Sequence, residues 1–351
     1  MYRDLGRLFA AEAAPTRADL AMKILQFNWE AFDAVAGLKY VTGVAIMLAL
    51  SAVIDFHWFA AGLSALLAWL TNLPGDYRKR SLGVLVFIGA GVLLAVLAYL
   101  LQGTYWPWLV AMFLVAFGGT FGMILGPRGF MVGWCLICWF YCTPLLGVAD
   151  DLAGFVGAHV LGSGIVLGLI TLQGFWQHRN ATVSLSTAQT DEDAQQSGRR
   201  FVFEYSLAVG AAMTIGLALG DAWLESDPTL IANATLMIIF PSFSQTWILA
   251  IDRIIGAVLG IVTGFYLGLY IQHELLEPVL WVVMSFFVLS MMNVNGGAVT
   301  FFFLVIFAAS WGAQGYVAGN AIANERIVAE LVGVALALLA VVTRNRLGTT
   351  S

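Results

Sequence analysis

Charge is scarce in this sequence. Only 11% of the 351 residues are charged and 60% are apolar, whereas soluble globular proteins have roughly 25% charged residues. This composition indicates a membrane protein. Lysine is the rarest charged residue and occurs only at Lys23, Lys39 and Lys79. None of the three stands in a G-x-x-x-x-G-K-[ST] loop, so the chain has no P-loop for a nucleotide.

Patterns for metal binding and covalent catalysis are also missing. The four histidines show no metal-ligand spacing, and no nucleophile stands in a recognisable arrangement with a base. We therefore expect no metal, no cofactor and no enzymatic activity. No basic block exceeds Arg78–Arg80, which argues against a nucleic-acid partner. The three cysteines, Cys135, Cys138 and Cys142, share one helical face; packing is favoured there over a soft-metal or redox role.

Long apolar runs fill most of the chain instead. A membrane-spanning helix needs about 20 mostly apolar residues, and twelve runs approach that length. They are residues 38–55, 57–74, 81–101, 105–126, 130–147, 153–174, 201–220, 227–243, 247–271, 278–293, 296–313 and 322–343. We expect an all-α polytopic membrane protein of about twelve transmembrane helices.

Basic residues orient these spans. If the N-terminus is cytoplasmic, fifteen of the sixteen Lys and Arg residues fall on the inner side and only Arg326 on the outer side. Both termini are therefore expected in the cytoplasm. Residues 1–37 are expected to form a cytosolic or interfacial helix, and residues 344–351 a cytosolic tail.

The spans divide into two groups of six around residues 175–200, the only long polar stretch and a predicted cytosolic linker. Two patterns recur at the same ordinal helix. Arg80-Ser-Leu-Gly83 opens the third span and Arg253-Ile-Ile-Gly256 the ninth, while His159-Val-Leu-Gly162 lies in the sixth and Glu330-Leu-Val-Gly333 in the twelfth. We predict parallel six-helix repeats over residues 38–174 and 201–343.

The arginines of the first pattern are candidate substrate-binding residues. Arg253 lies near the inner end of an apolar run, with Asp252 beside it, and charge at membrane depth usually marks a functional site. The alternative is an arginine whose side chain extends to the lipid headgroups, which fits Arg80 better because it stands in a basic triplet at the edge. We expect Arg253, helped by Arg80, to attract a carboxylate at the cytoplasmic mouth.

His159 and Glu330 are candidates for proton coupling, since both can titrate when desolvated within their spans. Their matched positions would let them approach one another across the repeat axis. The alternatives are a packed histidine bonded to a carbonyl, and an i,i+4 ion pair between Glu330 and Arg326. Glu204, early in the seventh span, is a further candidate for proton coupling and would either pair with Arg253 or face the headgroups.

Asn293 and Asn295 belong to an Asn-Val-Asn-Gly-Gly stretch between the tenth and eleventh spans. A plain turn is the favoured interpretation because Asn-Gly is a strong turn signal, and substrate contact is the alternative. Glycines follow each R-x-x-G pattern, and we expect these faces to permit close helix approach and to line the interface that moves.

Two groups of six spans, each with R-x-x-G and spaced glycines in its third helix, resemble the fusaric acid resistance (FUSC) family. That family includes the aromatic acid exporters and is related to plant aluminium-activated malate transporters. The resemblance covers about residues 38–343. Val84 and Ala257 stand where the family commonly has Thr, and the chain has only a linker and a short tail where larger members carry cytosolic domains.

The resemblance implies a multi-pass transporter of the bacterial inner membrane that exports small organic or aromatic acids, powered by the proton gradient. A passive anion channel and a non-transporting membrane subunit are the alternatives. The implied partners are the acid and the lipid bilayer. A homo-oligomer, and a periplasmic adaptor with an outer-membrane pore, are left open, as is the identity of the acid.

Overall fold

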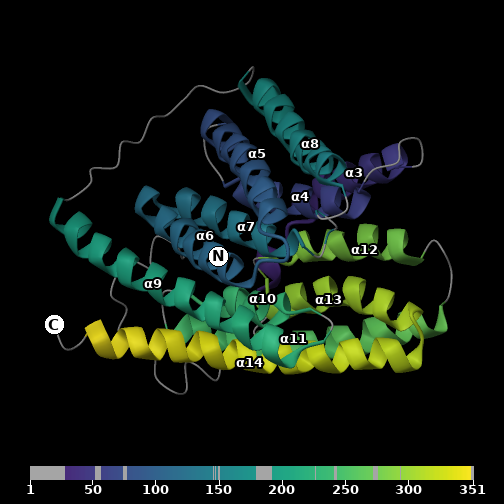
Figure 1. The fold of residues 1–351 in the computed structure, drawn as a ribbon. Helices are drawn as coiled ribbons and strands as arrows, with labels where there is room; N and C mark the ends of the chain where they lie inside the picture. Colours follow the sequence, from purple (N-terminus) through teal and green to yellow (C-terminus); the bar gives the residue numbers. More distant parts are fainter. Residues whose placement is uncertain are drawn as a thin grey trace. The chain divides into compact units, whose positions relative to one another are not determined.

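The computed structural model describes residues 28–51, 57–73, 77–144, 146, 148, 151–178, 192–225, 227–240, 243–271, 276–292 and 294–348. All regular structure in these residues is helical (Figure 1). The helices are η1 (Trp29–Ala31), α3 (Ala34–Ser51), α4 (Trp58–Thr71), α5 (Tyr77–Leu100), α6 (Tyr105–Phe121), η2 (Gly122–Leu125), α7 (Pro127–Cys142), α8 (Leu152–His178), α9 (Glu192–Trp223), α10 (Thr229–Ile238), α11 (Phe243–Tyr270), α12 (Leu276–Ser290), α13 (Gly296–Ala313) and α14 (Tyr316–Gly348).

Each of the twelve apolar runs overlaps one of the α-helices, in the same order along the chain. Among the described residues, seven helical segments are long and apolar enough to cross a membrane, and they come from α5, α6 with η2, α8, α9, α11, α13 and α14. Others are shorter: α10 has 10 residues and α4 has 14. A helix of 10 residues is about 15 Å long, half of the roughly 30 Å hydrocarbon core.

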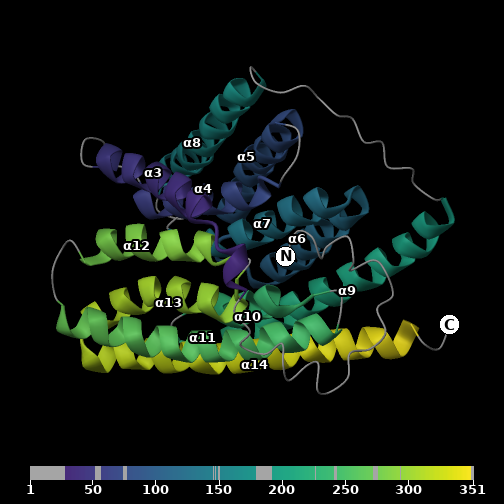
Figure 2. The same cartoon turned by 180° about the vertical axis from the view of Figure 1, so that it is seen from behind.

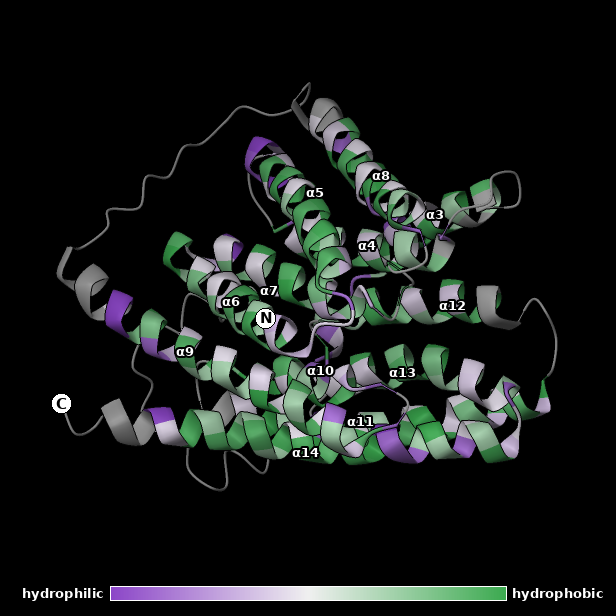
Figure 3. Ribbon diagram, viewed as in Figure 1, coloured by the Kyte–Doolittle hydropathy of each residue, from purple (hydrophilic) through white to green (hydrophobic). Residues whose placement is uncertain are grey.

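The surface of the helices suits lipid. Figure 3 shows ribbons that are hydrophobic along most of their length, with hydrophilic residues confined to short segments, among them parts of α11 and α14. Large apolar side chains are widely exposed, as at Leu93 on α5, Val110 on α6 and Leu339 on α14. In a soluble monomer such surfaces are rare, and here a bilayer would cover them.

The chain folds as two compact units. Unit 1 contains Met1–Leu48 and Ala212–Ser351, and unit 2 contains Ala49–Ala211. Most of α3 therefore belongs to unit 1, and the first two thirds of α9 belong to unit 2. The predicted N-terminal helix lies mostly outside the described residues, which begin at Asn28, and α9 begins within the segment expected to be a linker.

In unit 1, α11 packs against α13 through a stripe of glycines, and α14 lies beside them (Figures 1 and 2). A Cβ added at Gly260 would lie 2.6 Å from the carbonyl oxygen of Phe301. Such contacts recur every fourth residue and in the same order on both helices, so α11 and α13 are parallel. The glycines are Gly256, Gly260, Gly264 and Gly268, and they face the carbonyls of Gly297, Phe301, Val305 and Ala309.

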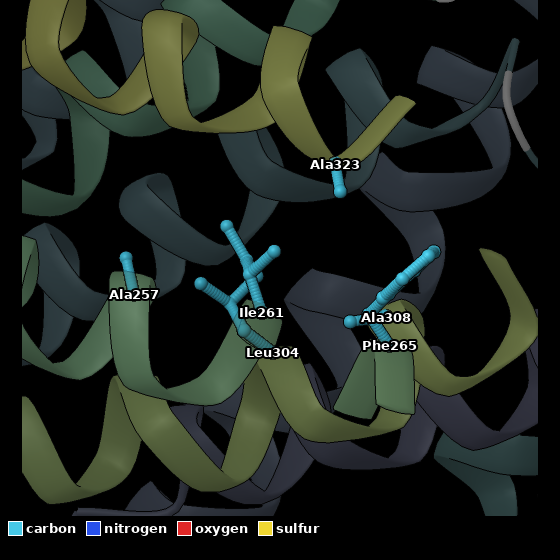
Figure 4. Packing of buried hydrophobic residues seen from close by; sticks show 6 residues of the cluster. All are labelled: Ala257, Ile261, Phe265, Leu304, Ala308 and Ala323. Atoms are coloured by element: carbon cyan, nitrogen blue, oxygen red, sulfur yellow. The ribbon is translucent and has the colours of Figure 1, made fainter. Parts of the chain in front are cut away.

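This close approach lets apolar side chains of three helices meet beside the stripe. Figure 4 shows the cluster: Ala257, Ile261 and Phe265 from α11, Leu304 and Ala308 from α13, and Ala323 from α14. All six side chains are buried. The glycine face of α11 is thus covered by α13. We expected this face to line an interface that moves.

Two further contacts involve the first helix of each predicted repeat. Gly37 of α3 lies against Phe286 of α12 within unit 1, and Gly210 of α9 lies against Phe113 of α6 within unit 2. The two glycines are 173 residues apart, and so are the two phenylalanines. Each unit therefore contains a contact between one predicted repeat and the other, at equivalent positions.

Candidate functional site

The most prominent polar feature of unit 1 is a cluster of three buried charges. Arg253 of α11 donates from Nε to Oε2 of Glu330 at 2.7 Å and from Nη2 to Oε1 at 2.9 Å. Arg326 of α14 donates to Oε1 of the same carboxylate at 2.8 Å. Arg326 and Glu330 are four residues apart and hence neighbours on one helix face, while Arg253 is brought to them because α11 packs on α14.

Burial makes this cluster energetically important. The exposed fractions are 8% for Arg253, 3% for Arg326 and 2% for Glu330. Charges in such an environment persist only if they are paired and hydrogen-bonded. The Nε atom of Arg326 is nevertheless buried without a hydrogen-bond partner. Two guanidinium groups thus share one carboxylate, and Arg253 holds it in the two-pronged geometry by which arginine recognises carboxylates generally.

The structure differs from expectation on how these residues are used. Arg253 is not a lone cation: the fork of its guanidinium holds Glu330. Glu330 is also deeper than expected, midway along the apolar segment Tyr316–Arg344, because α14 begins several residues before the run that predicted it. The i,i+4 ion pair with Arg326 is confirmed. We did not predict the pairing of Arg253 with Glu330 from the sequence. The signal for it was that both charges lie inside apolar runs, where each needs a partner.

Two other predicted acids lie close to arginines. Asp252, beside Arg253 on α11, is 5% exposed. Glu204 accepts a hydrogen bond from Nε of Arg200 at 2.8 Å, one turn earlier on α9. The pair of Glu204 and Arg200 is partly exposed, and neighbours at this spacing pair without help from tertiary structure.

His159 is the buried polar centre of unit 2. Its side chain is 0% exposed and is stacked on Trp139, with ring centroids 4.3 Å apart. Nε2 lies 3.3 Å from the carbonyl oxygen of Ile88, and Nδ1 lies 2.8 Å from the hydroxyl of Ser64. Because a carbonyl only accepts, Nε2 carries the proton and Nδ1 accepts from Ser64. Ser64 is also 2.6 Å from the hydroxyl of Ser163.

Glycine makes room for this histidine. A Cβ at Gly91 of α5 would collide with the ring of His159, and Trp139 donates to the carbonyl oxygen of Gly91 at 3.1 Å. The interpretation as a packed histidine bonded to a carbonyl therefore describes the geometry. His159 and Glu330 belong to different units, and each has its own partners there. Their approach to one another stays a prediction.

Arg80 has neutral partners. It donates from Nε to Oδ1 of Asn72 at 2.6 Å and from Nη2 to Oε1 of Gln173 at 3.4 Å. It is partly buried, and it forms no ion pair with any residue that the structure describes. Arg128 lies near enough to repel it. The side chain is therefore tied to α8 and to the residue after α4.

Asn295 is the N-cap of α13. Its side-chain oxygen accepts a hydrogen bond from the backbone N–H of Ala298 at 2.9 Å, which is the usual way to satisfy a helix start. The turn interpretation therefore accounts for Asn295. Asn293 lies outside the described residues. Within the described part of the chain, no three His, Cys, Asp or Glu side chains are grouped to hold a metal ion.

The part of the chain that contains the charge cluster matches a family model. The family model described as fusaric acid resistance protein-like matches residues 207–340, which include Arg253, Arg326 and Glu330. Neither the curated proteins nor the solved structures yield a match to the chain. Residues 207–340 are thus similar to the fusaric acid resistance protein-like family, which agrees with the predicted resemblance over this part of the chain, and the protein is a multi-pass membrane protein.

Proposed function

We propose that the protein is a secondary transporter of the bacterial inner membrane that exports small organic or aromatic acids. The observation that carries this proposal is the buried cluster of Arg253, Arg326 and Glu330. Ionisable groups at membrane depth are costly and are retained chiefly for function. Two arginines that share one carboxylate, with one buried donor unused, are chemically suited to an additional carboxylate.

A second cationic position supports an anionic substrate. Arg80 is held by the amide oxygens of Asn72 and Gln173 rather than by a carboxylate, so its charge is available to an anion. In the predicted topology Arg80 lies at the inner end of its helix, where a cytoplasmic acid would first arrive.

The proposal includes two six-helix repeats. Within unit 2, Gly162 of α8 lies against the backbone of Ala61 on α4; within unit 1, Gly333 of α14 lies against Ala234 and Thr235 on α10. These are the same helices of each half. The contact of α3 with α12 and the contact of α9 with α6 use residues that are 173 positions apart in the sequence. This spacing supports a duplication in which each half contributes its first helix to the other. The parallel packing of α11 and α13 agrees with the predicted topology.

Transport in proteoliposomes tests the proposal. The purified chain should move a panel of aromatic acids, benzoate among them, and a proton gradient should drive accumulation. Arg253→Gln should abolish transport because the bidentate fork is lost, whereas Arg200→Gln, which removes a partly exposed arginine of α9, should leave transport intact. Normal transport by the Arg253→Gln protein would contradict the proposal, as would a wild-type chain that moves none of the acids.

A passive anion channel is the second candidate. The observation in its favour is the glycine stripe of α11, which is closed tightly on α13 and makes this part of unit 1 a poor sliding interface. A channel needs no such movement. Flux that follows an imposed voltage and ignores an imposed pH gradient would select the channel, and accumulation against a concentration gradient would select the coupled transporter.

A further inference from the structure

Two neighbouring helices of unit 2, α5 and α7, begin at the same end of the unit. A Cβ added at Gly83 of α5 would lie 3.8 Å from Val132 of α7. Two turns further on, the carbonyl oxygen of Gly91 accepts a hydrogen bond from Trp139 at 3.1 Å. These contacts occur in the same order on both helices, so α5 and α7 are parallel and their first turns are neighbours.

Each of these first turns contains an arginine. Arg80 stands three residues before Gly83, and Arg128 stands four residues before Val132. The two arginines lie near enough to repel each other. The N-terminal end of a helix is also partly positive and disfavours a cation, and neither first turn contains an acidic residue. A bound anion would offset both of these unfavourable interactions.

The surrounding helices contain no carboxylate that could serve instead. Aspartate and glutamate are absent from α4, α5, α6, α7 and α8. Asp151 precedes α8 and lies near His57, whereas Gln173 is close to the other end of α8. Arg80 is partly buried and held by the amide oxygens of Asn72 and Gln173. These amides direct the guanidinium group but do not neutralise its charge.

An apolar surface continues from the same turn of α5. Leu82, Leu85 and Val86 are exposed. They follow Arg78 and Lys79, which are exposed as well, by three, four or seven residues, and residues at these spacings share one face of a helix. A ligand with an anionic head and apolar tails would therefore match both the basic turn and the surface beside it.

We propose that Arg80 and Arg128 bind the phosphate of an acidic phospholipid, whose acyl chains cover the exposed apolar face of α5. The planar fork of a guanidinium group matches the oxygens of a phosphate. Basic pockets between transmembrane helices on the cytoplasmic side bind acidic head groups, and the predicted topology puts this end of α5 there. A free phosphate ion would use the same donors, but it would not cover the apolar face.

This inference goes beyond the proposed function and does not rest on transport. An organic acid that arrives at Arg80 would compete with the head group for the same guanidinium. The phospholipid differs from the acid because it is present in the bilayer at all times and reaches the site from the side of the helix. Binding of the lipid can therefore be measured without any transported substrate.

Thermal unfolding of the purified full-length chain in detergent micelles tests the site. Anionic phosphatidylglycerol, zwitterionic phosphatidylcholine or inorganic phosphate is added in a concentration series. A ligand of the folded state raises the melting temperature, and we expect phosphatidylglycerol to do so at a concentration about tenfold lower than either of the others. Equal effects of the two lipids would overturn the inference. An equal effect of inorganic phosphate would also overturn it, because the site would then bind a soluble anion.

Variants show whether the two arginines form the site. Arg80→Gln and Arg128→Gln should each weaken phosphatidylglycerol binding about tenfold. Arg200→Gln removes the same charge from a partly exposed pair on α9 and should bind the lipid like wild type. Equal weakening by Arg200→Gln would indicate a diffuse attraction to charge and would overturn the inference.

A conservative variant covers the case in which the glutamine variants do not fold. Arg80→Lys keeps the positive charge and loses the planar fork, so it should also weaken phosphatidylglycerol binding. Wild-type binding by Arg80→Lys would overturn the assignment of the phosphate to this guanidinium group. The comparison of the two lipids on the wild-type chain needs no variant and decides between a selective site and none.

Discussion

Arg253 and Glu330, 77 residues apart in the sequence, form a bidentate ion pair between α11 and α14. Both helices carry ionisable residues inside apolar segments, where a charge is costly unless it is paired. Together they satisfy each other, and the directionality of the two hydrogen bonds defines how α11 and α14 are aligned. The same pair therefore serves the fold and the proposed carboxylate site.

The first prediction concerns stability. Glu330→Ala removes the only carboxylate bonded to Arg253 and Arg326, among the residues that the structure describes, and leaves two buried cations without compensation. We expect a loss of about 3–5 kcal/mol in the free energy of unfolding, measured in detergent micelles. Glu204→Ala removes a partly exposed pair and should cost about 1 kcal/mol or less. Equal losses in the two variants would show that the buried cluster contributes no more to the free energy of unfolding than the partly exposed pair does.

The second prediction concerns the room made for His159. Gly91→Ala places a methyl group against the imidazole ring, which must leave its stacked position on Trp139. We expect a loss of about 1–3 kcal/mol on unfolding, and a change in tryptophan fluorescence. Gly89→Ala is the matched control: no atom lies within 4 Å of its new Cβ, and it should be neutral or slightly stabilising. Identical behaviour of the two variants would contradict the packing around His159.

The third prediction is a pH dependence at Asp227, which lies between α9 and α10. Burial raises the pKa of its carboxyl above the ordinary value of 3.8, although Thr229 and Arg326 act in the opposite direction. The folded state thus holds this proton more tightly than the unfolded state does. Stability from this group is complete below pH 3.8 and is lost as the pH rises through the raised pKa.

Asp227→Asn stays neutral, so its melting temperature relative to wild type should increase as the pH rises and then level off. Thermal unfolding of both proteins across a pH series measures this difference. Asp221→Asn, at an exposed position near the end of α9, controls for the change in net charge. A difference that shrinks with rising pH would contradict the assignment to Asp227.

The fourth prediction concerns the exchanged first helices. Residues 1–185 and 186–351, expressed together as two chains, should assemble and purify as one complex. Each half supplies a helix that the other needs, through the contacts of Gly37 with Phe286 and of Gly210 with Phe113. Gly37→Leu should weaken this assembly, since its side chain would meet Phe286 and Ser290, whereas Gly89→Leu should not. Stable, separately folded halves that do not associate would exclude the exchange.

Local properties of the sequence account for the positions of the helices. Each apolar run overlaps an α-helix because backbone groups in an apolar environment must be paired within the segment. Spacing along one helix also accounts for two ion pairs, Arg326 with Glu330 and Arg200 with Glu204, since residues four apart share a face. The N-cap role of Asn295 follows in the same way from the turn signal that contains it.

By itself, then, the sequence determined roughly which segments are helical, which of them carry ionisable residues, and that residues 207–340 are similar to the fusaric acid resistance protein-like family. Only the tertiary structure decided that Arg253 binds Glu330, that Gly91 accommodates His159, and that the glycines of α11 are closed on α13. These are contacts between helices distant in the chain. They depend on the complementarity of whole surfaces, which a periodic pattern within one helix does not encode.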